Sequence, residues 1–270
     1  LTGAVVSVRI KLSKIPSSFI SVKEERVKSL SQMLELLRLY DHHYLYTVAW
    51  IDLSGRFEGR GIVSGGNHAT LSDLKSREKN QPYRVKYPGK ILLPDVFPSF
   101  TINKYSVGLF NQIWYQKPIS KTPLHYRNFL HPLDSIRHWN RIYGKNGFVQ
   151  YQVLVPFGKE VILEELLNEL RKLQAGSFLG VLKRFDGKRQ RYLSFPDSGW
   201  TLAIDLPAQL PGIYDFFNRF DLRLAQEGGK VYLTKDSRMS QEIFEIMYPE
   251  YNSWKAIQRD MDPQRYWKSL

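Results

Sequence analysis

The sequence predicts an α+β fold in which helices cover one face of an antiparallel sheet. Three observations lead to this prediction. Strand-like and helix-like patterns follow one another in the order βαββαβ across residues 148–234. Both helix-like stretches carry apolar side chains at helical spacing, and glycine-containing turns separate several of the elements. This order is the split βαβ arrangement, which leaves the second face of the sheet free for a ligand.

The first strand of this unit, residues 148–155, has two different faces. Its apolar side chains alternate with Gln150 and Gln152, so the two amides point to the same side, away from the core. Amides both donate and accept hydrogen bonds, and a pair of them suits a polyhydroxylated ligand lying across the sheet. A solvated edge face is the alternative, and it is the commoner fate of alternating glutamines.

The same periodicities place the other elements. Strands are expected at residues 1–12, 44–53, 61–64, 104–117, 178–184, 200–206 and 231–234. Helices are expected at residues 26–40, 159–174 and 211–226, and around 243–247 and 254–257. Gly65 and Gly66 are expected to turn the chain, and Thr70 with Asp73 resembles a helix start. Residues 80–101 lack any period and predict a long surface loop.

The composition narrows the classes of protein. A chain of 270 residues that is 43% hydrophobic can bury a substantial core. It contains no cysteine, which excludes disulfides, thiolate metal sites and a cysteine nucleophile and fits a reducing compartment such as the cytoplasm. No apolar run in the sequence is long enough to cross a bilayer.

The chain is strongly basic, with a formal net charge of +13. Such a charge indicates a polyanion, an anionic cofactor or substrate, or a membrane surface as partner, or else it serves solubility alone. The basic residues are spread along the chain, which disfavours nucleic acid as that partner. His125, His131 and His138 lack the spacing of zinc ligands, so no metal site is expected.

Five blocks of sequence carry a family resemblance: HWNRIYGKNGFVQYQVLVPFG, SFLGVLKRFDG, LSFPDSGWTLAIDLP, GGKVYLTKDSRMS and MYPEYNSW. In this order they resemble the cap, or substrate-binding half, of FAD-dependent oxidoreductases of the vanillyl-alcohol-oxidase (VAO/PCMH) type, and within that type the decaprenylphosphoryl-ribose oxidase group. The resemblance implies an upstream domain that binds FAD and a cap whose sheet covers the flavin ring.

The resemblance also implies domain limits. The opening Leu1-Thr2-Gly3 resembles the end of the family's glycine-rich GLTG segment. Residues 1–12 are therefore expected to be the tail of the FAD-binding domain, residues 13–248 the cap domain, and residues 249–270 a C-terminal helical segment that stops before the family's last helix is complete. Most of the FAD site would lie outside this chain, which is expected to be inactive alone.

The site residues follow from the same resemblance. Lys235 matches the family's essential lysine near the flavin and the reacting hydroxyl, and Tyr232 and Gln152 match neighbours of the flavin. The residues expected to bind substrate are Gln150, Gln152, Lys183, Phe185, Leu179, Trp50, Thr201 and Leu130. The implied chemistry is hydride transfer from a secondary alcohol to the flavin, which leaves a ketone. Without the family context, Lys235 is an ordinary solvated residue at a strand end.

Three positions depart from the ribose oxidase pattern. Thr201 stands in place of an asparagine, Ala203 in place of a cysteine and Leu130 in place of a tyrosine. Each departure changes the hydrogen bonding or the volume of the expected pocket. The substrate is therefore left open among a sugar-phosphate lipid, a sugar, an alditol and a lactone.

Two other classes of function compete with this interpretation. The order βαββαβ is also that of RNA-recognition domains, and Gly147–Tyr151 matches the tail of their GFVxF/Y signature. The front of that signature is missing, and the match falls on the first strand instead of the third. The other alternative is a non-catalytic remnant that serves as a binding domain.

Overall fold

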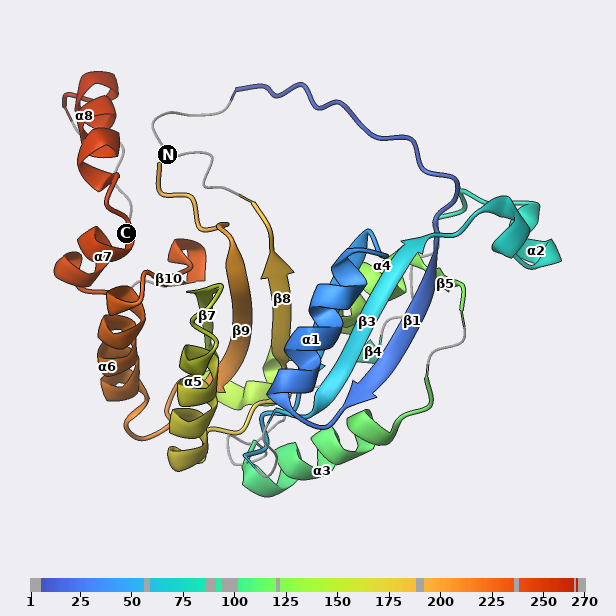
Figure 1. The fold of residues 1–270 in the computed structure, drawn as a ribbon, viewed down its shortest axis with the longest axis horizontal. Coiled ribbons are helices and arrows are strands. Elements are labelled where there is room, and N and C mark those ends of the chain that lie inside the picture. The colour runs from blue at the N-terminus through green and yellow to red at the C-terminus, as the bar shows by residue number, and fades with distance from the viewer. Residues whose placement is uncertain are drawn as a thin grey trace.

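The structure is a computed structural model that describes residues 6–55, 59–85, 91–93, 102–119, 122–187, 192–235, 238–264 and 266. Its centre is an eight-stranded sheet with the strand order β10-β7-β9-β8-β2-β3-β1-β5 (Figure 1). The strands are β1 Phe19–Val27, β2 Tyr46–Ile51, β3 Gly61–His68, β5 Leu124–His125, β7 Phe148–Pro156, β8 Gly180–Phe185, β9 Gly199–Pro207 and β10 Lys230–Val231. All neighbouring pairs in it are antiparallel, and β4 (Ile91–Leu92) and β6 (Ile136–Arg137) form a separate parallel pair.

The sheet consists of two units with the same strand arrangement. In the second unit, β7, β8, β9 and β10 lie in the order β10-β7-β9-β8, and in the first unit β1, β2, β3 and β5 lie in the order β5-β1-β3-β2. In each unit the fourth strand therefore flanks the first, and the second strand lies at the inner edge. The units join through their second strands, where Trp50 of β2 pairs with Val181 of β8. The βαββαβ unit expected from the sequence is confirmed, and its partner unit continues the same sheet.

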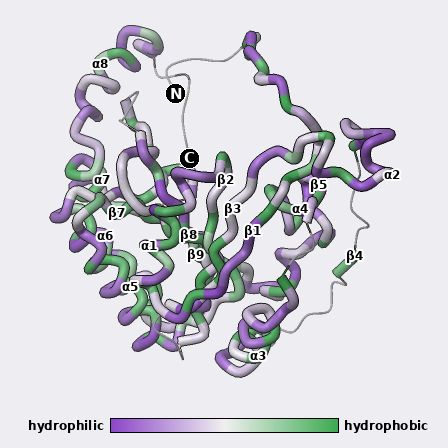
Figure 2. Tube along the Cα trace, turned by 45° about the vertical axis from the view of Figure 1, so that its right-hand side comes forward, coloured by the Kyte–Doolittle hydropathy of each residue, from purple (hydrophilic) through white to green (hydrophobic). Residues whose placement is uncertain are grey.

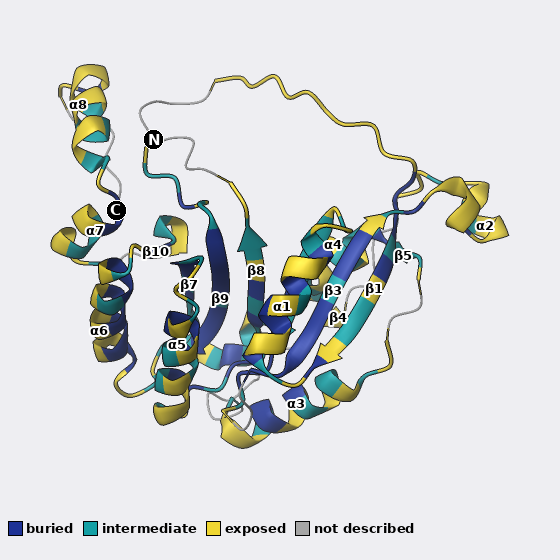
Figure 3. Cartoon of the chain, viewed as in Figure 1, coloured by how far each residue is buried: buried dark blue, intermediate teal, exposed yellow. Residues whose placement is uncertain are grey.

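Three long helices cover one face of this sheet: α1 Leu30–Asp41, α5 Val161–Lys172 and α6 Ile213–Gln226 (Figure 1). Each places an apolar stripe against the strands, so its outer side is exposed and its inner side is buried (Figure 3). One hydrophobic core runs across both units and contains Met33, Leu37, Leu163, Trp200, Phe216 and Phe217. Burying a side chain of this size stabilises the fold by about 1.5–3 kcal/mol. The α+β architecture with helices on one face is confirmed.

The remaining helices are short or lie at the margins of the sheet. They are α2 Ser76–Lys79, α3 Lys104–Gln116, α4 Tyr126–Leu130, α7 Gln241–Met247 and α8 Tyr251–Met261, with the 3-10 helices η1 Leu71–Asp73, η3 Pro132–Ser135, η4 Trp139–Asn146 and η5 Leu233–Lys235. The helix start expected at Thr70 and Asp73 is confirmed by the capping box of η1. Among the residues that the structure describes, no helix combines the length and the apolar character that a membrane span requires.

The expected strand at residues 104–117 is wrong, because this segment forms α3. The Asn103 side chain caps the helix by accepting from the backbone N–H groups of Tyr105 and Ser106. Val107 and Asn111 are buried one turn apart. The run of aromatic residues suggested a strand, whereas the cap and the spacing of the buried side chains are those of a helix.

The expected turn at Gly65 and Gly66 is also wrong, since both residues lie inside β3. A Cβ atom at Gly65 would come within 2.4 Å of the Tyr44 ring, and one at Gly66 within 2.6 Å of Ile20. These glycines are therefore required by close packing in a strand and not by a turn.

The N-terminal segment differs from the expected strand at residues 1–12. Residues 6–12 form no strand and are exposed, and residues 1–5 lie outside the described part. Hydrophobic residues alternate with hydrophilic ones along this extended segment (Figure 2). The first strand is instead β1, which the sequence pattern did not indicate because the charged run from Lys23 to Arg26 masks its alternation.

One further expectation is correct only at its start, and another is tested only in part. The strand expected at residues 231–234 ends at Val231, and the chain then turns into η5. Of the loop expected at residues 80–101, the described portion contains the two-residue strand β4, and residues 86–90 and 94–101 lie outside the description.

Candidate active site

The register between β7 and β9 builds a polar surface on the face opposite the helices. Gln150 pairs with Asp205, and Gln152 pairs with Ala203. The intervening residue Tyr151 is only 3% exposed and packs in the core. Because side chains alternate across a strand, the two amides project from the helix-free face, as their spacing predicts.

Both amides are engaged in hydrogen bonds. Gln150 Nε2 donates to Asp205 Oδ1 at 2.6 Å, and Gln152 Nε2 donates to Thr201 Oγ1 at 3.1 Å. β7 lies between β10 and β9, so it is not the edge strand of the sheet. Each amide keeps its second hydrogen-bonding group for another partner.

The neighbouring strands extend this surface. Lys183 of β8 pairs with Thr201, and Val181 pairs with both Ala203 of β9 and Trp50 of β2. By the alternation of the strands, these five side chains share the face of the two glutamines. Lys183 is exposed, Thr201 is buried, and the Trp50 indole Nε1 donates to the carbonyl oxygen of Phe178 at 3.0 Å.

A pocket of about 820 Å³ lies on this face between the sheet and the segment that contains α4 and η3. Of the residues expected to bind substrate, five line it: Trp50, Leu130, Leu179, Lys183 and Phe185. Gln150, Gln152 and Thr201 share the sheet face and are not among its lining residues. The structure therefore brings the expected residues to one face, with Leu130 contributed from the opposite wall.

Lys235 and Tyr232 follow β10 at the other side of β7. The Tyr232 N–H donates to the Gln152 carbonyl oxygen at 2.9 Å, and the Lys235 N–H donates to the Tyr232 carbonyl oxygen at 3.0 Å. The Tyr232 ring stacks on Phe195 with ring centroids 4.6 Å apart. Lys235 is exposed, and its positive charge acts on the Asp205 carboxyl by lowering its pKa.

Sequence reasoning missed Asp205, the buried acid of this surface. Its burial raises the pKa of the carboxyl to about 6, against the opposing effects of the Gln150 hydrogen bond and the Lys235 charge. Its Oδ2 atom is buried and has no hydrogen-bond partner among the described residues. The sequence did carry a signal for it. Asp205 is a charged residue inside the otherwise apolar strand TLAIDLP, and a buried acid in such a strand is unusual.

Tyr143, on η4, is a second buried group beside this acid. Burial raises the pKa of the Tyr143 hydroxyl, and the negative charge of Asp205 raises it further. Its ring stacks on Phe148 with centroids 4.6 Å apart. Tyr143 thus stays protonated beside Asp205 at neutral pH.

The candidate RNA-binding signature is placed unsuitably for a base. Its aromatic position, Tyr151, lies under α6 and donates from its hydroxyl to Asp221 Oδ1 at 2.6 Å. A ring that is buried in the core cannot stack on a base at the open face. In the described ranges, no group of three or more His, Cys, Asp or Glu side chains could hold a metal ion.

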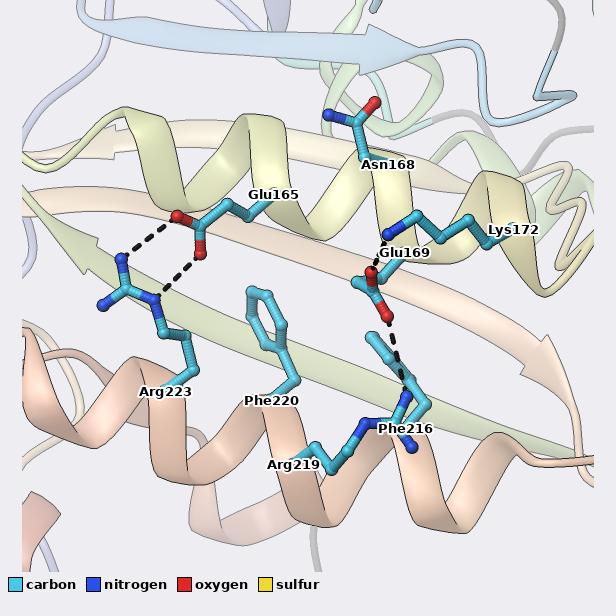
Figure 4. Close-up of a pocket in the computed structure, with 8 residues that line it drawn as sticks. All are labelled: Glu165, Asn168, Glu169, Lys172, Phe216, Arg219, Phe220 and Arg223. Carbon is cyan, nitrogen blue, oxygen red and sulfur yellow. Dashed lines mark hydrogen bonds and ion pairs between the residues drawn. The ribbon is translucent and has the colours of Figure 1, made fainter.

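A second hollow, of about 430 Å³, lies between α5 and α6 on the outer side of the helix layer (Figure 4). Its charged side chains pair with one another: Arg223 with Glu165 at 3.0 Å, and Lys172 with Glu169 at 2.6 Å. This hollow is on the opposite side of the sheet from the glutamines, so it is not part of the candidate site.

Comparison with known proteins gives relatives along nearly the whole chain. Decaprenylphosphoryl-beta-D-ribose oxidase from Mycolicibacterium smegmatis (strain ATCC 700084 / mc(2)155) is 33% identical over 273 residues, which are 97% of this chain and 58% of that protein. An uncharacterized protein in the mprA 5' region of Streptomyces coelicolor is 26% identical over 280 residues, which are 100% of this chain and 76% of that protein. No family model matches the chain.

Two solved structures are distant matches. They are 6-hydroxy-D-nicotine oxidase from Arthrobacter nicotinovorans, with a TM-score of 0.46 at 13% identity, and a chitooligosaccharide oxidase, with a TM-score of 0.45 at 12% identity. Each covers 92% of this chain, which spans 53% of the matched structure. The sequence similarity confirms the resemblance carried by the five blocks, and it places the chain among the relatives of decaprenylphosphoryl-β-D-ribose oxidase.

Proposed function

We propose that this chain is the substrate-binding part of an FAD-dependent oxidoreductase that oxidises a secondary alcohol of a sugar, a sugar-lipid or an alditol. The observation that carries the proposal is the polar surface of Gln150, Gln152, Thr201 and Asp205 beside the pocket with Lys183 and Trp50. The similarity to an oxidase named for a sugar-lipid substrate supports it.

The residues of this surface fit a flat ring with a polar edge. Val181 and Ala203 are uncharged and of modest size, and Gln152 adds an amide to the same row. Gln152, Tyr232 and Lys235 would hold the flavin of FAD, which accepts a hydride from the alcohol carbon when it is bound. The carboxyl of Asp205, which pairs with Gln150 on the same face, is a further polar group, and its Oδ2 atom is buried.

Lys235, together with the remaining side chains of the site, would also act on the substrate itself. The Lys235 ammonium would orient the reacting hydroxyl and stabilise negative charge on its oxygen. Gln150 would bind a second hydroxyl, and Lys183 would place a positive charge in the pocket, as an anionic sugar-lipid requires. Trp50, Leu130, Leu179 and Phe185 supply the apolar walls of that pocket.

The domain limits at residues 1–12, 13–248 and 249–270 form part of this proposal. Val6, Val8, Ile10 and Leu12 are 68–96% exposed, an arrangement that suits packing against another part of a longer protein. The chain spans 58% of the length of its oxidase relative. We propose that an upstream domain binds FAD, and that the protein works in the cytoplasm and contacts the membrane surface where a sugar-lipid is the substrate.

Visible spectroscopy tests this proposal. The chain would be expressed together with any coding sequence that precedes it, and its spectrum recorded before and after anaerobic addition of sugar alcohols. We expect a flavin spectrum that bleaches, and loss of bleaching in Lys235→Ala with the flavin still bound. Lys79→Ala, on the remote helix α2, is the matched control and should bleach like the wild type. A colourless protein that FAD cannot reconstitute would contradict the enzyme and favour a non-catalytic binding domain.

A further inference from the structure

The pair formed by Gln150 and Asp205 couples a ligand-facing amide to a buried acid. The two residues lie opposite each other on β7 and β9, and Gln150 Nε2 donates to Asp205 Oδ1 at 2.6 Å. Asp205 is 0% exposed, whereas Gln150 is partly exposed. The amide therefore stands between the buried carboxyl and the open face of the sheet.

The chemistry of the two groups determines which end of the amide faces outward. An ionised carboxylate can only accept hydrogen bonds, whereas an amide has a donor end and an acceptor end. The Gln150 NH₂ group must then point to Asp205, which leaves its carbonyl oxygen for the ligand. A protonated carboxyl can also donate, so this requirement disappears when Asp205 takes up a proton.

The second amide lacks such a constraint. Gln152 is hydrogen-bonded to the hydroxyl of Thr201, and a hydroxyl both donates and accepts. Either end of the Gln152 amide can therefore face Thr201. Only Gln150, which pairs with an acid, has an amide whose outward-facing end is fixed.

We propose that Asp205 is a positioning residue: while ionised, it holds the Gln150 amide with its carbonyl oxygen toward the substrate, where it accepts a hydrogen bond from a substrate hydroxyl, and on protonation it releases this orientation. The inference rests on the proposed function, in that this face of β7 and β9 takes the substrate, and it names what the site recognises there. The recognised group is a hydroxyl that donates a hydrogen bond. An ether oxygen at the same place could only accept, and it would face the Gln150 carbonyl oxygen, which is also an acceptor.

The surroundings of Asp205 let it titrate near neutral pH. Burial raises the pKa of its carboxyl to about 6. Among the described residues, the titratable groups that face it are Tyr143 on η4, which burial keeps protonated, and Lys235 on η5, whose charge favours the carboxylate. The buried Oδ2 has no hydrogen-bond partner among the described residues, so no second hydrogen bond fixes the carboxyl, and a half-turn of its plane brings a protonated oxygen to the Gln150 amide.

Nuclear magnetic resonance of the 270-residue chain tests the coupling directly. Side-chain amides would be followed with ¹⁵N-labelled glutamine and the Asp205 carboxyl with ¹³C-labelled aspartate, between pH 4.5 and 8, conditions chosen to bracket a pKa of about 6. We expect the Gln150 NH₂ resonances to shift with the same midpoint as the Asp205 carboxyl. Gln150 resonances that stay constant while Asp205 titrates would overturn the proposal.

Three variants separate this role from a merely structural one. Asp205→Asn should abolish the pH-dependent shift of Gln150, and Gln150→Leu should raise the Asp205 midpoint by roughly one pH unit, because a hydrogen bond to the charged form is lost. Thr201→Val removes the partner of Gln152 alone and is the matched control, which should leave the Gln150 shift intact. A Gln150 shift that survives in Asp205→Asn would assign the titration to another group and overturn the inference.

Binding of xylitol and of its per-O-methyl ether distinguishes this inference from the proposed function. Xylitol should bind about 3- to 10-fold more weakly below the Asp205 midpoint than above it, the worth of one hydrogen bond, and the ether, which has no hydroxyl donor, should not bind. Equal binding of the two compounds would overturn the acceptor role of Gln150. Intact coupling between Gln150 and Asp205 without xylitol binding at any pH would contradict the proposed function and not the pairing.

Discussion

Arg238 Nη1 donates to Asp221 Oδ2 at 2.8 Å and thereby ties the chain that follows Lys235 to α6. Asp221 is buried and also accepts from the Tyr151 hydroxyl at 2.6 Å. The Arg238 guanidinium lies over the Phe217 ring, 4.4 Å from its centroid. This anchor lies three residues after Lys235, so it holds the segment that carries the proposed catalytic lysine.

We expect Arg238→Met to destabilise the protein by about 3 kcal/mol, because it removes the ion pair between Arg238 and the buried Asp221 carboxylate. Urea unfolding followed by tryptophan fluorescence measures the change. Arg219→Met, which removes an exposed pair with Glu169 at 3.6 Å, is the matched control and should stay close to the wild type. Equal losses in the two variants would contradict the anchoring role of Arg238.

The glycines inside β3 predict a steric effect. Gly65→Ala should destabilise the protein by about 1–3 kcal/mol, because its Cβ atom would come within 2.4 Å of the Tyr44 ring and within 2.7 Å of the Tyr40 ring. Gly187→Ala, where a Cβ atom meets nothing within 4 Å, should change the stability by less than about 0.5 kcal/mol. Thermal unfolding of both variants tests the difference, and a neutral Gly65→Ala would refute the packing argument.

Asp205 predicts a dependence of stability on pH. Its pKa is raised from 3.8 to about 6 in the folded protein, so the folded state keeps a proton that the unfolded state has already lost. The stability from this group is fully present below pH 3.8 and is lost as the pH rises through about 6, by up to about 3 kcal/mol.

Asp205→Asn, which cannot ionise, should therefore gain stability relative to the wild type between pH 4 and pH 7. Urea unfolding of both proteins at pH 4 and at pH 7 measures how the difference in their free energies of unfolding changes with pH. The contributions of the other titrating groups are the same in both proteins and cancel. A difference between the two proteins that does not change with pH would show that Asp205 does not titrate with a raised pKa.

Removal of the Lys235 charge is expected to change the pKa of the Asp205 carboxyl. This positive charge lowers the Asp205 pKa, so Lys235→Ala should move the carboxyl midpoint upward. Carbon-13 resonance of the Asp205 carboxyl measures this shift. Lys183→Ala removes a lysine from the same sheet face and serves as control, with no change expected. An unchanged midpoint in Lys235→Ala would mean that the lysine is electrostatically separate from Asp205.

The spacing of apolar residues along the sequence was sufficient to predict part of the fold. It predicted β7, β9 and the apolar stripes of α1, α5 and α6, because alternation in strands and helical spacing are properties of neighbouring residues. It failed where another local signal competed with it, as at α3, where aromatic residues concealed the Asn103 cap. At β1 the charged run from Lys23 to Arg26 likewise concealed the alternation of apolar residues that is typical of a strand.

The sequence by itself determined that Gln150 and Gln152 share the face opposite Tyr151, since the strand pleat allows no other placement. Only the tertiary structure decided what lies beside them. The bond from Gln150 to Asp205 joins residues 55 positions apart, and the pairing of Trp50 with Val181 unites two units that the local pattern treats separately. Such contacts depend on strand register and sheet order, which the packing of the whole chain determines.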